Sequence, residues 1–169
     1  MQRFEDPKLC LTGSRWINHF TFAFVPLILF IGVVFLSIFH DRPINTDRSK
    51  LAQICTICLT GFSFWWHNRA LRFKTFTTTF SAEVNRDRFL ALAGKHDWLI
   101  TDEFNLNSIE AKTQPTILGR SQMITVRFSG NQVSVNSILD PDGLPLPVSF
   151  WVNLENFRLV YAELCAPNP

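Results

Sequence analysis

The first forty residues contain a long segment without formal charge. No Asp, Glu, Lys or Arg occurs from Trp16 to Phe39, and the apolar run within this segment begins at Phe20. As an α-helix, a run of about 20 residues is roughly 30 Å long, which matches the hydrocarbon core of a bilayer. A small soluble domain has little use for such a helix, so we interpret the segment as a membrane span.

This segment reads as a retained anchor rather than a cleaved signal peptide. A signal peptide has an apolar core of roughly 7–15 residues followed by small side chains at the cleavage site. Here the run is longer and ends in the bulky sequence Leu36 to Asp41, while Glu5 and Asp6 interrupt the basic N-terminal region. Pro26 lies inside the run, where we expect a modest kink.

A second uncharged segment extends from Leu51 to Trp66. It is slightly shorter than the usual span of 17–25 residues, but Lys50 can snorkel at one end and the Trp65-Trp66 pair resembles an aromatic belt at the other. We expect two spans, at about 17–39 and 50–66. The alternatives for the second segment are a helix lying in the interface and a core helix of a soluble domain.

The basic residues favour one orientation. Three flank the first segment on its N-terminal side and three follow the second, against three in the connecting loop from His40 to Lys50. Cytoplasmic flanks carry the excess of Lys and Arg. The sequence therefore predicts two cytoplasmic termini. The six flanking residues are Arg3, Lys8, Arg15, Arg69, Arg72 and Lys74.

The chain is expected to divide into a membrane anchor, residues 1–69, and a soluble α+β domain, residues 70–169. From Arg69 onward ten basic residues balance ten acidic ones. A neutral domain lacks the basic footprint of nucleic-acid binding, so no nucleic-acid partner is expected. About 100 residues suffice for one small core.

The pattern of the domain predicts the order β-α-β-β-β-β-α, with an antiparallel sheet covered by helices on one face. Gly130-Asn131 predicts the tight turn of the best-defined hairpin, and Asp140 to Gly143 predicts a further turn. The expected strands are 73–80, 98–104, 108–113, 122–128 and 132–138, and the expected helices run from about 85 to 94–97 and from about 153 to 165.

Two details of the helices are also predicted. Asn85 is the expected N-cap of the first, with Val84 and Phe89 forming a hydrophobic staple around it. The final helix is expected to bury one apolar stripe. Its members are Leu154, Phe157, Tyr161 and Leu164.

The domain pattern resembles that of small bacterial membrane proteins of unassigned function. These proteins pair two N-terminal transmembrane helices with a C-terminal cytoplasmic α+β domain. The resemblance rests on Phe76-Thr-Thr-Thr, on Trp98 at the start of a strand, and on the run from Ile124 through Gly130-Asn131 to Pro141. The match is partial, because residues 118–122 and 150–153 depart from the group's pattern. The resemblance implies the fold and the anchorage, and it implies no activity.

Cys55 and Cys58 form a C-x-x-C pair in the middle of the second segment. A redox pair needs a position where a thiolate is stabilised, commonly a helix N-terminus. Within a span a thiolate would be desolvated, so we interpret both as small packing residues. Cys10 and Cys165 are distant in sequence, and neither a zinc site nor a disulfide framework is expected.

Acid–base chemistry would require His96, Asp97, Asp102, Glu103 or Asp140 to gather in a cleft. We interpret these residues as helix-end, strand-edge and turn positions meeting water. Ser134 and Ser137 lack a nucleophile elbow, and phosphate-binding, dinucleotide-binding and metalloprotease motifs are absent. The sequence predicts no catalytic residue, no cofactor and no metal, and His19 and His67 are expected at the membrane interface.

We therefore expect a non-enzymatic, multi-pass protein of the bacterial inner membrane. Its partners would be the lipid bilayer and either a membrane protein complex or a second copy of the chain, with the cytoplasmic domain acting as an interaction or complex-stabilising module. The alternative is a membrane-surface domain that senses a small ligand or lipid. Phe150 and Trp151, beside a Pro-rich loop, are the candidate partner or ligand surface.

Overall fold

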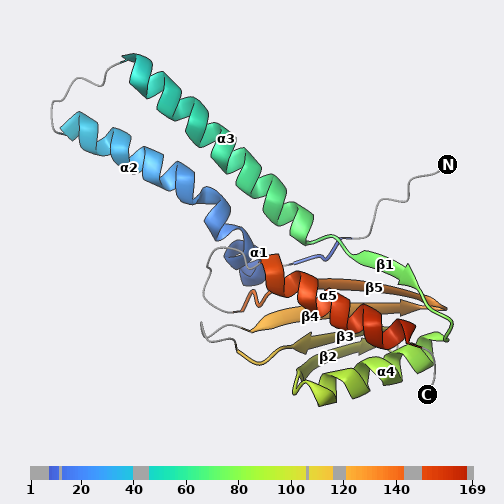
Figure 1. Ribbon diagram of the computed structural model, residues 1–169. Helices are drawn as coiled ribbons and strands as arrows, with labels where there is room; N and C mark the ends of the chain where they lie inside the picture. Colours follow the sequence, from blue (N-terminus) through green and yellow to red (C-terminus); the bar gives the residue numbers. More distant parts are fainter. Residues whose placement is uncertain are drawn as a thin grey trace, which may run out of the picture.

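The computed structural model describes residues 8–11, 13–39, 46–105, 107–115, 121–142 and 150–166. A helical hairpin projects from an α+β domain (Figure 1). The elements in chain order are α1 (Gly13–Phe20), the 3-10 helix η1 (Thr21–Phe24), α2 (Val25–Phe39), α3 (Thr46–Ala70), β1 (Lys74–Thr77), α4 (Ala82–Lys95), β2 (Leu99–Asn105), β3 (Ser108–Lys112), β4 (Gln122–Ser129), β5 (Gln132–Leu139) and α5 (Phe150–Cys165).

The five strands form one antiparallel sheet in the order β1-β5-β4-β3-β2. The predicted α+β class and the predicted order of elements in the domain are confirmed. At the tip of the β4–β5 hairpin, Ser129 pairs with Gln132, and Gly130 between them has φ +58°. A positive φ at the first of two turn residues is typical of a type II′ turn, in which glycine avoids a steric cost.

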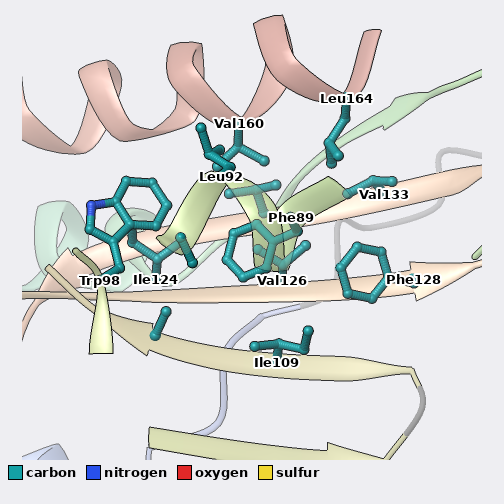
Figure 2. Packing of buried hydrophobic residues seen from close by; sticks show 13 residues of the cluster. Phe89, Leu92, Trp98, Ile109, Ile124, Val126, Phe128, Val133, Val160 and Leu164 are labelled. Carbon is teal, nitrogen blue, oxygen red and sulfur yellow. The ribbon is translucent and has the colours of Figure 1, made fainter. Parts of the chain in front are cut away.

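The main core lies between the sheet and the two helices α4 and α5 (Figure 2). Ile124 and Val126 of β4 alternate with residues that point to the other face, as the pleat requires. They meet Phe89 of α4 and Val160 of α5. All four side chains are fully buried. The predicted covering of one face by helices is therefore confirmed.

The opposite face of the sheet is covered as well, which the sequence did not lead us to expect. Met123 of β4 and Ile138 of β5 point to that face, and both are buried. They pack against the segment before α1, against α1 itself and against the connection from α3 to β1. We call this cluster the junction core. Its members are Leu9, Leu11, Phe20, Leu71, Phe73, Met123 and Ile138.

The uncharged N-terminal segment is not one straight helix. The chain bends by 65° between α1 and the first half of α2, across η1. Pro26 lies in the first turn of α2, where its missing N–H is not needed, whereas a continuous helix would lose a hydrogen bond there. In addition, Thr21 Oγ1 donates to the Ile17 carbonyl at 2.7 Å, an arrangement that bends helices. The expected modest kink is thus a sharp break placed before the proline.

In the described part of the chain, no single helix is both long and apolar enough to cross a bilayer. The bent pair Gly13–Phe20 and Val25–Gly32 satisfies length and composition when taken together. The α2 and α3 helices lie side by side (Figure 1). The α3 helix has 25 residues and extends beyond the predicted span of about 50–66 at both ends.

The predicted cap of α4 is wrong. Ser81 is the N-cap: its backbone is extended and its side chain accepts from the Val84 N–H at 3.4 Å. Asn85 is instead a fully buried residue inside the helix, where its Nδ2 donates to Thr78 Oγ1 at 2.8 Å. The Val84–Phe89 staple is lost with that cap, because Val84 is 40% exposed, whereas Phe89 is fully buried.

The predicted stripe of α5 is shifted. Val160 and Leu164 are fully buried, whereas Tyr161 is 47% exposed and Leu154 and Phe157 are half-buried. The helix begins at Phe150, earlier than predicted. Residues 40–45 of the predicted connecting loop lie outside the described residues, as does the Pro-rich loop at residues 144–147.

Candidate functional site

The helical hairpin and the sheet meet in a network of charged side chains. Arg15 of α1 forms two hydrogen bonds to the Asp142 carboxylate, from Nε to Oδ1 at 2.9 Å and from Nη2 to Oδ2 at 2.8 Å. Its third nitrogen, Nη1, lies 3.4 Å from both carboxylate oxygens of Glu110 in β3. One arginine thereby joins the first helix to a strand and to the turn that follows β5.

Lys112 completes this network from the sheet side. Its Nζ lies 2.9 Å from both Asp140 Oδ2 and Asp142 Oδ2. The turn itself is held by the Asp142 N–H, which donates to Asp140 Oδ1 at 3.0 Å, as an Asx turn does. The predicted turn at Asp140 is therefore present, and its carboxylates bind the cations of two other elements.

The pKa values of Arg15, Lys112 and Asp142 are shifted by their contacts with one another. The hydrogen bond from Arg15 lowers the pKa of Asp142, against partial desolvation, and Lys112 lowers it further. The same hydrogen bond raises the pKa of Arg15. Partial burial lowers the pKa of Lys112, but its bonds to Asp142 and Asp140 outweigh this effect and the net direction is upward. These three shifts all favour the charged forms of Arg15, Lys112 and Asp142.

A row of three buried polar residues crosses the same face of the sheet. Glu110 pairs in register with Thr125, and Thr125 pairs with Asn136. Asn136 Nδ2 donates to the carbonyls of Ala70 at 2.8 Å and Arg72 at 3.0 Å, at the point where α3 passes into β1. Within the described residues, Thr125 Oγ1 and Asn136 Oδ1 have no hydrogen-bond partner. Asn136, at one end of the row, therefore fixes the end of α3 to the sheet.

The two histidines predicted at the interface lie together at the base of the hairpin. The His19 and His67 rings are 5.4 Å apart between centroids, with Phe20 and Phe64 beside them. His19 Nε2 is 3.1 Å from the His67 carbonyl, and His67 Nδ1 is 2.8 Å from the Ser63 carbonyl. His19 therefore uses one ring nitrogen to join α1 to α3, and His67 uses one ring nitrogen to bond to its own helix. Among the described residues, no group of three or more potential metal ligands occurs.

The other candidates from the sequence are dispersed. His96 lies against Trp98, and Asp97 is an exposed residue with φ +52° at the end of α4. The side chains of Asp102 and Glu103 lie outside the described part of the structure, so the interpretation of both as strand-edge residues stays a prediction.

The serines have structural partners. The Ser134 and Thr75 hydroxyls are 2.8 Å apart across the β1–β5 pair. Ser137 is buried under α5, where its hydroxyl and Gln122 Oε1 both accept from Asn156 Nδ2. Neither serine contacts a histidine among the residues that the structure describes.

None of the four cysteines forms a disulfide, and the predicted partner surface is described in its backbone alone. Cys55 and Cys58 are exposed on α3, and Cys10 and Cys165 are exposed on the domain side, all four as free thiols. The backbones of Phe150 and Trp151 form the first residues of α5, but their side chains lie outside the described part of the structure.

The fold and its junction define an α+β protein with a docked helical hairpin. No protein-family model, curated protein or solved structure matches the chain.

Proposed function

We propose that the chain is a non-enzymatic, membrane-anchored protein whose α+β domain serves as an interaction or complex-stabilising module at the cytoplasmic face of the bacterial inner membrane. One observation carries the proposal. Of the eighteen exposed large hydrophobic side chains in the described part of the chain, fifteen lie between α1 and the end of α3. Soluble monomers rarely expose contiguous apolar patches of that extent, whereas lipid covers them.

The aromatic residues support a bilayer boundary at the domain end of the hairpin. Trp16 of α1 and Trp65 of α3 are both exposed, and ring contacts through Phe20 and Phe64 connect the two helices at this level. Tryptophan prefers the interface between hydrocarbon and headgroups. A boundary there leaves the sheet in water and the remaining length of the hairpin in lipid.

The packing of the N-terminal segment agrees with a two-span topology. The Leu9 N–H donates to the Leu71 carbonyl at 2.8 Å, so the chain before α1 and the chain after α3 lie together. Two spans require both ends on one side of the membrane. The excess of basic flanking residues supports the cytoplasm as that side.

Two experiments test anchorage and orientation. After extraction of membranes with alkaline carbonate, we expect the chain to stay in the pellet; release into the supernatant would contradict a spanning anchor. A reporter fused after Pro169 should show cytoplasmic activity. Alkaline phosphatase activity at that position would reverse the topology.

The rigid junction supports a role as an interaction module. Arg15 and Asn136 hold the domain against the end of the anchor, so the sheet would keep a fixed orientation to the bilayer. A fixed orientation helps a surface to dock on another membrane protein, because less freedom is lost on binding. Purification in mild detergent should yield a complex or an oligomer; a chain that always elutes alone as a monomer would contradict this role.

The alternative is a domain that senses a small ligand or lipid at the membrane surface. A ligand pocket is usually a cavity lined by apolar side chains. The main core is instead filled by fully buried residues such as Ile109, Ile124 and Val133. We therefore favour the interaction module, and place the contact with lipid at the outer surface of the junction.

A further inference from the structure

Four basic residues lie where the hairpin joins the domain. Lys8 and Arg72 are partners in an isolated antiparallel bridge, and the Arg72 N–H donates to the Arg69 carbonyl at 3.1 Å. The Arg127 guanidinium lies 4.4 Å from the centre of the Phe73 ring, and Phe73 directly follows Arg72 in the chain. All four basic side chains are exposed. We call Lys8, Arg69, Arg72 and Arg127 the junction cations.

The junction cations differ from the other basic residues of the site. Arg15 and Lys112 are used in ion pairs with carboxylates. In the described part of the chain, the junction cations form no ion pair. Arg69 and Arg127 instead lie over the faces of Trp65 and Phe73, a cation–π arrangement that leaves the guanidinium N–H groups able to donate to an acceptor.

Their level along the hairpin matches that of lipid headgroups. Arg69 follows Trp65 by one helical turn, about 6 Å along the axis. A headgroup layer extends roughly 5–7 Å beyond the hydrocarbon core on each side. If Trp65 marks the boundary of the hydrocarbon, Arg69 and its neighbour Arg72 lie among the phosphate groups.

We propose that the junction cations form a binding surface for the phosphate groups of anionic phospholipids. The proposal rests on the membrane anchorage proposed above. The planar fork of arginine matches two phosphate oxygens, and the side-chain ammonium of lysine adds a point charge. Glu5 and Asp6 precede Lys8 and lie outside the described residues, but with both counted the group keeps a net charge of +2.

The test uses the full chain reconstituted in phosphatidylcholine vesicles that contain increasing fractions of phosphatidylglycerol. Brominated versions of each lipid quench tryptophan at short range, so the quenching of Trp65 and its neighbours gives the relative affinity of the two lipids. One basic residue near an anionic surface changes affinity about 5-fold. We expect a clear preference for phosphatidylglycerol, and a decrease of about 5-fold or more in the double variant Lys8→Gln, Arg72→Gln.

A matched control removes the same charge elsewhere. Lys95 at the end of α4 and Arg158 on α5 are both exposed and lie outside the junction core, and the variant Lys95→Gln, Arg158→Gln should keep the preference. Equal affinities for the two lipids in the native chain would overturn the proposal. So would an equal decrease in both double variants, because the effect would then follow net charge alone.

Two further measurements distinguish a lipid surface from a site for free phosphate and from a failure of the anchorage. Inorganic phosphate, compared with chloride at the same ionic strength, should leave the lipid preference unchanged; its loss would show a site for free phosphate instead. Retention after carbonate extraction is measured on the same vesicles. A retained chain without lipid preference refutes the surface alone, whereas a chain released by carbonate refutes the anchorage on which it rests.

Discussion

Arg15 on the first helix holds Asp142, in the turn after the last strand, through two hydrogen bonds of 2.9 and 2.8 Å, although 127 residues separate them in the chain. The pair connects the hairpin to the domain directly. It lies at the edge of a sheet face that is itself buried by the junction core. The orientation of the domain to the hairpin is therefore set by specific contacts as well as by the covalent connection.

The strength of this pair can be measured with a double-mutant cycle. Arg15→Gln and Asp142→Asn, alone and together, should give a coupling free energy of about 0.5–1 kcal/mol for a partly exposed, bidentate pair. The readout is chemical unfolding in detergent. Arg15→Lys keeps the charge but loses the fork, so it should fall between the native chain and Arg15→Gln. Purely additive single effects would show that the pair contributes nothing to the junction.

The same pair predicts a dependence on acid. The pKa of Asp142 is lowered in the folded state by Arg15. The contribution of Asp142 to stability is therefore fully present above its unfolded pKa of about 3.9. It is lost as the pH falls through the lower pKa of the folded state. The midpoint of thermal unfolding of the native chain should approach that of Asp142→Asn as the pH decreases from 6 to 3. A difference between the two that stays constant over this range would contradict the ionised pair.

Asn136 should be essential for fixing the end of α3. Its Nδ2 donates to two backbone carbonyls in a buried setting. Asn136→Asp is nearly isosteric but replaces this donor by an oxygen, so it should destabilise the fold by about 1–3 kcal/mol or more. Gln132→Ala, an exposed change in the same strand, should stay within about 0.5 kcal/mol. Equal effects of the two changes would mean that the bonds to Ala70 and Arg72 are not important.

In the last two turns of α5, Leu164 belongs to the core and Tyr161 to the surface. Leu164 is fully buried between the helix and the sheet (Figure 2), whereas Tyr161 is half-exposed beside Phe76 and Phe157. Leu164→Ala should cost about 2–5 kcal/mol, and Tyr161→Ala clearly less. Unfolding free energies in detergent compare the two. A larger loss for Tyr161→Ala would restore the stripe that the sequence pattern favoured.

The strands were predictable because their signals are local. Alternating β-branched residues mark β4 and β5, and Gly130 supplies the positive φ that their turn requires. The cap of α4 was not predictable, since Ser81 and Asn85 are both good cap residues and only the fold decides which is buried. Asn85 turns inward to Thr78 and the Phe80 carbonyl, which leaves Ser81 to cap the helix.

The junction could not be predicted from sequence spacing. Arg15 meets Glu110 and Asp142 across 95 and 127 residues, and no periodicity links charges at such separations. The uncharged segment was recognised, but its break at Thr21–Phe24 depends on where the chain tolerates Pro26. Composition thus predicted an anchor, while the docking of α1 and of the α3–β1 connection against the second face of the sheet depends on tertiary contacts.

The most direct test of the membrane anchor uses the native cysteines. Cys55 and Cys58 lie near the middle of α3, while Cys10 and Cys165 lie on the domain side, and all four are exposed. In intact membranes made permeable to a water-soluble maleimide, we expect a Cys55→Ser, Cys58→Ser variant to be labelled rapidly. A Cys10→Ser, Cys165→Ser variant should be labelled only after denaturation in SDS, because lipid covers its thiols. Rapid labelling of Cys55 and Cys58 in native membranes would contradict the account.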